Sequence, residues 1–96
     1  MTYAISNVEG DHLGFILLSG GPDSGDCLVR SQPFDSHVKE TNESVFLRKL
    51  QLLGELKWER VTDEFQIMSQ DGEVLLVEKA GRMRGAGFNY MVEEIS

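Results

Sequence analysis

The sequence has little cysteine, proline and tryptophan, and it contains no long hydrophobic run. One cysteine, two prolines and one tryptophan occur among its 96 residues. Cys27 has no second cysteine with which to form an intrachain disulfide, so the fold must rest on a hydrophobic core, and this cysteine usage is typical of a reducing compartment. No apolar stretch approaches the roughly 18 residues that a membrane-spanning helix needs. We therefore expect neither a disulfide scaffold nor a membrane partner.

Basic residues are also scarce, since 9 of them stand against 16 acidic residues and the formal net charge is -7. Such a charge repels phosphate backbones unless positive charge is concentrated locally, so general nucleic-acid binding is not expected. The acidity could instead imitate nucleic acid toward a basic partner, and the composition leaves this alternative open. Residues 1–12 lack a basic leader followed by an apolar segment, which indicates a cytoplasmic protein.

The segment from Thr41 to Lys57 is the one whose periodicity most strongly predicts a helix. Thr41 or Asn42 can cap its start, because a short side-chain oxygen there accepts an otherwise unpaired backbone N–H. Gly54 costs about 1 kcal/mol relative to alanine inside a helix, so it marks either close packing or an early helix end. The large apolar residues spread over roughly 220° of the helical wheel, about twice the arc that one sheet contact needs.

Part of this apolar surface therefore needs a second cover, on a flank formed by Val45, Leu52 and Leu56. The cover could be another layer of the same chain, the aliphatic stem of Lys49, or the same helix of a second copy. We adopt the homodimer as the working interpretation, with these apolar residues at its interface.

Strand signals lie on both sides of the predicted helix, and the connections between them are too short for crossovers. They predict an α+β fold, a mainly antiparallel sheet of about six strands in the order β-β-β-α-β-β-β, packed with one central helix in a single domain over residues 1–96. The segment Leu13–Leu18 has apolar residues on both faces and is expected to be central and covered on two sides. The other strand segments are 2–8, 27–30, 63–79 as a hairpin, and 88–95, with 58–62 as an extended connection and 80–87 as a loop.

The strongest local β signal is the hairpin around Asp71 and Gly72. These two residues suit a two-residue type I′ turn, because both central positions require positive φ. That turn sets a register in which Ser69 opposes Val74, Met68 opposes Leu75, Gln66 opposes Val77, Ile67 opposes Leu76 and Phe65 opposes Glu78.

The sharpest short motif follows an apolar strand: Ser19-Gly20-Gly21-Pro22-Asp23-Ser24. It resembles the SGGxDS fingerprint of the PP-loop ATP pyrophosphatase family. The resemblance implies a phosphate-contacting loop formed by Ser19, Gly20, Gly21, Asp23 and Ser24, preceding a helix whose N-terminus faces the phosphates of ATP. It covers about six residues, and the segment up to Pro33 leaves no room for the long helix of that family. An ordinary turn uses the same residue types.

The other candidate sites are polar clusters without a recognised spacing. His12 and His37 with Asp11, Asp35 and Cys27 could in principle bind a metal or act as an acid–base pair, but they match no ligand motif. Lys79, Arg82 and Arg84 form the one basic cluster of the sequence, between glycines that let backbone amides approach an anion. We expect Arg82 and Arg84 to be exposed and to contact an anion or an acidic partner.

Two functional hypotheses result. The first is a small acidic interaction module that is not an enzyme and associates with itself, with a further protein partner that the sequence does not identify. The second is a nucleotide- or phosphate-binding protein that uses the Ser19–Ser24 loop. We favour the first, which requires no cofactor or metal and leaves enzymatic activity an open question.

Overall fold

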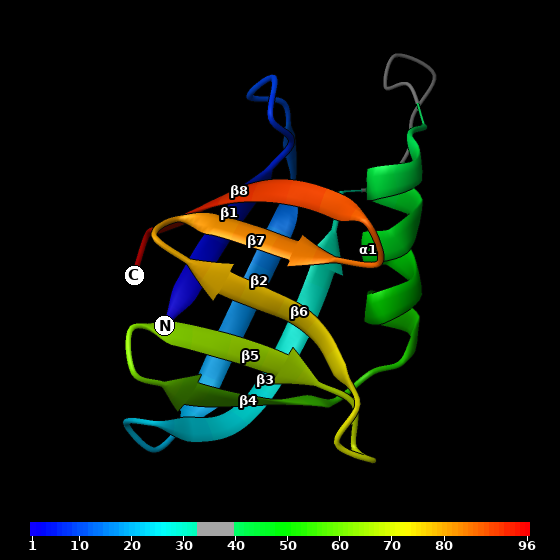
Figure 1. Ribbon diagram of the computed structural model, residues 1–96. Coiled ribbons are helices and arrows are strands. Elements are labelled where there is room, and N and C mark those ends of the chain that lie inside the picture. The colour runs from blue at the N-terminus through cyan, green and yellow to red at the C-terminus, as the bar shows by residue number, and fades with distance from the viewer. Residues whose placement is uncertain (33–39) are drawn as a thin grey trace.

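The strands of the protein close into a barrel. A computed structural model describes residues 1–32 and 40–96, and within them eight strands pair antiparallel in chain order, with β8 returning to β1 (Figure 1). The strands are β1 (Thr2–Ser6), β2 (His12–Gly20), β3 (Ser24–Ser31), β4 (Leu56–Val61), β5 (Glu64–Met68), β6 (Val74–Lys79), β7 (Arg82–Gly85) and β8 (Phe88–Glu94). One helix, α1 (Asn42–Leu52), follows β3.

This architecture corrects the predicted α+β fold, in which about six strands formed a sheet packed with a central helix. The predicted extended connection after the helix is a full strand, β4, which pairs with both β3 and β5. The predicted loop of residues 80–87 contains β7, flanked by tight turns at Ala80-Gly81 and Ala86-Gly87. With these two strands the sheet is wide enough to close into a barrel. Its inner face then encloses the core, so no open face remains for a central helix to cover.

The barrel interior is filled by side chains, as expected for a barrel of this strand number. Inward-facing residues alternate along every strand, and Trp58, Tyr90 and Phe65 are the largest fully buried side chains. The predicted double burial of the second strand is wrong. Ile16 and Leu18 point inward and are buried, but Leu17 faces outward and is 38% exposed, because one side of a barrel wall faces solvent.

Helix α1 packs chiefly on β3 and makes further contacts with β2 and β8. It lies at the end of the barrel away from both chain termini (Figure 1). Its buried residues Leu47 and Leu50 belong to the barrel core, and the Tyr90 hydroxyl donates a hydrogen bond to the Glu43 carbonyl oxygen at 2.8 Å. The amide of Ser31 donates to Gln51 Oε1 at 2.7 Å. The helix therefore covers this end of the barrel instead of lying between two layers.

The ends of α1 follow from local chemistry. Thr41 is the N-cap, as predicted, and its hydroxyl accepts a hydrogen bond from the Ser44 amide at 3.2 Å. Gly54 has φ 79° and its amide donates to the Gln51 carbonyl, so a left-handed glycine ends the helix. The predicted continuation to Lys57 is therefore wrong. After Gly54 the chain turns and enters β4.

This early end removes Leu56 from the predicted apolar flank of the helix. Leu56 is the first residue of β4 and only 1% exposed in the barrel core. Val45 is half-buried on the helix, whereas Leu52 is 79% exposed and Leu53, the C-cap residue, is 59% exposed. The exposed apolar surface is thus a pair of leucines at the helix end, smaller than the predicted three-residue interface.

The β5–β6 hairpin corrects the predicted two-residue turn. Of the Asp71-Gly72 pair only Gly72 has positive φ, at 90°, and the Ser69 amide donates to the Glu73 carbonyl across a loop of three residues. A bulge then leaves Leu75 unpaired, so Met68 faces Val74. The predicted pairs of Ser69 and Met68 are wrong, but the bulge restores the register, and Ile67–Leu76, Gln66–Val77 and Phe65–Glu78 are confirmed.

Two further observations complete the fold. Within the described segments, α1 is the sole helix, and it is too short and too polar to cross a bilayer. The candidate ligands Asp35 and His37 lie outside the described residues.

Candidate functional site

The Ser19–Ser24 motif forms the turn between β2 and β3. Gly20 pairs with Gly25, and the Gly21 amide donates to the Ser24 carbonyl oxygen at 2.9 Å. Gly20 has φ 110°, and a Cβ there would lie 2.7 Å from the Gly25 Cα, so glycine is required by the close approach of the two strands. Ser24 begins a strand, whereas the PP-loop resemblance implies a helix after the motif.

The backbone of this turn is engaged within the protein. The carbonyl oxygen of Ser19 accepts a hydrogen bond from the Trp58 indole at 2.9 Å, and that of Asp23 accepts one from the Arg60 amide at 2.6 Å. These contacts join the turn to β4. They account for the glycines and the turn residues by local structure, and the element that follows the motif is a strand.

The three basic residues near the end of the chain do come together on the outer wall of the barrel. Lys79 on β6 faces Arg82 on β7, and Arg84 on β7 faces Asn89 on β8. Arg82 and Arg84 are exposed, as predicted. Met83 between them points into the core, and this alternation places both arginines on the same outer face. Three of the 9 basic residues of an acidic protein thus occupy adjacent strands.

These side chains line a groove of about 720 Å³, here called the basic groove. A Cβ on Gly85 would collide with the Leu75 carbonyl oxygen, whereas one on Gly87 would meet nothing within 4 Å. Val77, Ala80 and Phe88 provide apolar surface. The full lining is Glu64, Val77, Lys79, Ala80, Arg82, Arg84, Gly85, Gly87, Phe88 and Asn89.

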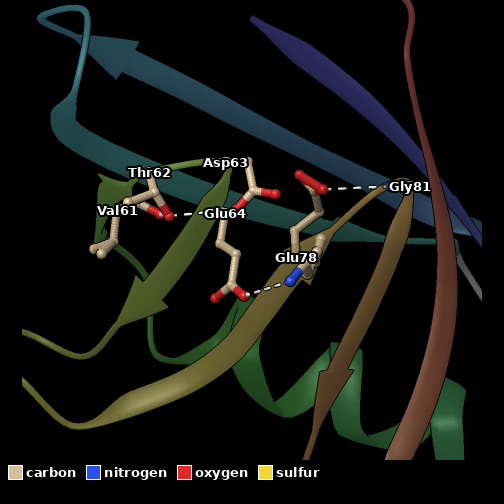
Figure 2. A network of polar contacts seen from close by, with 7 residues as sticks. Val61, Thr62, Asp63, Glu64, Glu78 and Gly81 are labelled. Atoms are coloured by element: carbon tan, nitrogen blue, oxygen red, sulfur yellow. Dashed lines mark hydrogen bonds and ion pairs between the residues drawn. The ribbon is translucent and has the colours of Figure 1, made fainter.

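One carboxylate reaches the edge of the basic groove. Glu64 lies 3.6 Å from the Lys79 ammonium, and Figure 2 shows this ion pair beside the β4–β5 and β6–β7 turns. The Lys79 side chain is 62% exposed, so solvent weakens the pair and its charge remains available to a ligand. In the same view Glu78 accepts a hydrogen bond from the Gly81 amide at 3.4 Å, which helps to fix the β6–β7 turn next to Arg82.

A second depression of about 550 Å³ adjoins the basic groove and shares Arg82, Arg84 and Asn89 with it. We call it the side depression. Its other lining residues are Val8, Tyr90 and Met91. The two arginines therefore stand between two hollows that each carry apolar side chains.

A polar cluster occupies the end of the barrel opposite α1. Arg60, Glu78 and Glu94 stand at inward-facing positions of β4, β6 and β8, around the phenol of Tyr3. Burial first, and then the Glu94 carboxylate, raise the pKa of Tyr3, whereas a hydrogen bond with Arg60 lowers it. The alternation of β6 could have revealed this cluster, because Glu78 pairs with the buried residues Phe65 and Met83.

The remaining candidates that the structure describes are His12, Asp11 and Cys27. Among residues 1–32 and 40–96 no group of three or more His, Cys, Asp and Glu side chains could hold a metal ion. The ring of His12 packs on Phe15, with centroids 4.7 Å apart. Cys27 is buried, and burial raises the pKa of its thiol to about 12, so it is a poor nucleophile.

Sequence reasoning identified Arg82 and Arg84 but missed Val77, Phe88 and Asn89 as lining residues of the basic groove. For Val77 and Asn89 the signal is the alternation of inward and outward positions along β6 and β8, which can be used only once β7 is recognised between them. Phe88 shares the inward side with Tyr90 and packs on Phe46, so alternation does not reveal it as a lining residue. Comparisons of the chain with protein-family models, curated proteins and solved structures found no match.

Proposed function

We propose that this protein is a non-enzymatic binding module that captures an anionic partner on the basic groove. The observation that carries the proposal is the gathering of Lys79, Arg82 and Arg84 around one groove in a chain with a net charge of -7. A basic patch does not lower the solubility of an acidic protein. Three adjacent cations repel one another, however, unless an anion is near.

The groove has the groups that anion recognition requires. Arginine presents several N–H donors in a planar fork, and its bonds to carboxylate or phosphate oxygens are stronger than neutral hydrogen bonds. Lysine adds a mobile point charge at the edge. Asn89 contributes an amide that can donate or accept.

The test is titration of the protein with inorganic tripolyphosphate and with citrate, followed by calorimetry. Wild-type protein should bind at least one of these anions, and affinity should fall as salt is added, because exposed charges are screened. Arg82→Ser combined with Arg84→Ser should abolish binding. Arg30→Ser is the matched control, since Arg30 is an exposed strand arginine outside the groove.

Two results would contradict the proposal. One is a wild-type protein that binds neither anion at millimolar concentration and low salt. The other is an equal loss of binding in the Arg30→Ser control, which would show that the effect depends on overall charge and not on the groove.

We also propose self-association through the end of α1, as a second and separate property. The support is the exposure of the adjacent apolar residues Leu52 and Leu53. Leu52→Asp with Leu53→Asp should convert a dimer into a folded monomer in sedimentation velocity. Val74→Asp, a comparable change at another exposed apolar residue, should leave the dimer intact, and a wild-type monomer at all concentrations would refute the proposal.

Finally, we propose that the protein works in the cytoplasm. The lone buried thiol of Cys27 supports a reducing setting, because nothing in the fold depends on its oxidation.

A further inference from the structure

We infer that the anionic partner of the basic groove is an extended acidic segment of a protein, with an apolar residue two positions before and two positions after a central carboxylate. This inference rests on the proposed function and names the partner that would use it. It follows from the arrangement of apolar and basic side chains across three neighbouring strands and the β1–β2 turn.

The order of groups across the barrel wall is apolar, basic, apolar. Val77 on β6 pairs with Arg84 on β7, Arg82 on β7 pairs with Met91 on β8, and the side depression holds Met91 and the exposed Val8. Val8 is 66% exposed and Met91 is 38% exposed, so both have apolar surface that a ligand could cover. A small inorganic anion would use the arginines and leave both apolar hollows empty.

The distances suit a short stretch of polypeptide. Moving from β6 across β7 and β8 to β1 crosses three strand spacings of about 4.8 Å, or roughly 14 Å. An extended chain advances about 3.3 Å per residue, so four to five residues cover this span. One central carboxylate would then lie between Arg82 and Arg84, which are two positions apart on β7. The side chains two residues before and after it share its face of the extended peptide, so they would enter the two hollows.

The surroundings of the site disfavour a long polyanion. Glu64 lines the basic groove on the β5 side, and Glu93 is exposed on β8 beyond Met91. A nucleic acid continuing past the arginines would meet these carboxylates, and duplex DNA carries one charge per about 1.7 Å. Single strands also need aromatic platforms for their bases, but Tyr90 is buried in the core and the half-buried ring of Phe88 packs on Phe46.

The experiment is fluorescence anisotropy with labelled nine-residue peptides at physiological salt. The first peptide has one glutamate with a leucine two residues before it and another two residues after it, within glycine and serine, so that the three side chains share one face of an extended chain. The second replaces both leucines by serine and keeps the charge, and the third replaces the glutamate by glutamine. We expect saturable binding of the first peptide, at least about tenfold weaker binding of the second, and none of the third.

Protein variants locate the contacts. Arg82→Ser with Arg84→Ser should abolish binding of the first peptide, and Val8→Ser with Met91→Ser should weaken it to the level of the serine peptide without changing tripolyphosphate binding. All four side chains lie at the surface, and circular dichroism of each variant confirms that the fold is retained.

The outcomes separate this inference from the proposed function. Equal binding of the leucine and serine peptides overturns the inference, as does arginine-dependent binding of tripolyphosphate without binding of any peptide, and in both cases the anion-binding function stands. Displacement of the first peptide by a single-stranded oligonucleotide at lower concentration also overturns it. If neither peptides nor inorganic anions bind, both proposals fail.

Discussion

The indole nitrogen of Trp58 donates a hydrogen bond to the carbonyl oxygen of Ser19 at 2.9 Å, across 39 positions of the chain. Trp58 stands on β4 and is 2% exposed, while Ser19 lies near the end of β2. This contact ties the two strands on either side of β3 to one another inside the barrel. It also explains why a polar ring atom can be buried there without an energetic penalty.

Trp58→Phe should therefore destabilise the protein by about 2–4 kcal/mol. The change leaves the Ser19 carbonyl without its donor and opens a small cavity in the core. Urea denaturation followed by circular dichroism measures the loss, since this variant has no tryptophan. Ser19→Ala is the control, because its carbonyl remains and its side chain is exposed, and an equal loss in that variant would show that the hydrogen bond is not the cause.

Arg82→Ser with Arg84→Ser should change the melting temperature by no more than about 2 °C. Both side chains are exposed on the outer wall, and isolated surface charges contribute little to stability. Differential scanning calorimetry provides the measurement. A large decrease would mean that these arginines are structural, and loss of ligand binding in the same variant could then not be assigned to the basic groove.

Ala86→Gly should raise the unfolding free energy by about 0.5–1 kcal/mol. Ala86 has φ 54° in the β7–β8 turn, a conformation that costs a residue with a Cβ about 1–2 kcal/mol and costs glycine little. Part of this gain is offset by the greater freedom of glycine in the unfolded chain. Ala4→Gly, the same change inside β1, should destabilise instead, and a shift of the same sign in both variants would contradict the assignment.

Stability should fall as the pH rises above about 9. Burial raises the pKa of the Cys27 thiol from 9.0 to about 12, so between these values the unfolded chain loses a proton that the folded protein keeps. The contribution is complete below pH 9 and decreases by up to about 1.4 kcal/mol per pH unit above it. Chemical denaturation between pH 8 and 10 tests this. Burial also raises the pKa values of Tyr3 and Tyr90 above 10.0, so both tyrosines add to the loss near pH 10, and a variant without Cys27 is needed to isolate the contribution of the thiol.

The matched variant for this measurement is Cys27→Ala. The free energy of unfolding of this variant will be lower because of the cavity. The part of its pH dependence that is due to Cys27 should disappear. A wild-type and a variant curve that run parallel over this range would refute the assignment.

Some elements of this fold could be predicted because their signals are local. The Thr41 cap depends on one side chain and one amide, and the inward pairs of the β5–β6 hairpin depend on alternation. Closure of the barrel has no such signal. It depends on β7, a strand with the single inward apolar residue Met83 between alanine-glycine turns, and two of its turn positions are alanines in a conformation that favours glycine.

The candidate site also combines residues that have a local sequence signal with residues that have none. Lys79, Arg82 and Arg84 are close in sequence, so their clustering was visible without a structure. The apolar members of the site, Val8 and Met91, are brought to the arginines by the curvature of the sheet and the pairing of its first and last strands. Residues that are far apart in the chain and have ordinary identities cannot be recognised as neighbours before that pairing is known.

The pairing of β1 with β8 differs from every other pairing in the barrel. Each of the others joins strands that follow one another in the chain, whereas this one brings Ile5 opposite Val92. The entropy cost of ring closure is therefore concentrated in one step, which requires the intervening hairpins to be in place. The pairing of β1 with β8 should therefore form late in folding and separate early in unfolding. Because Val8 and Met91 lie beside it, opening of the barrel and loss of the side depression should be the same event.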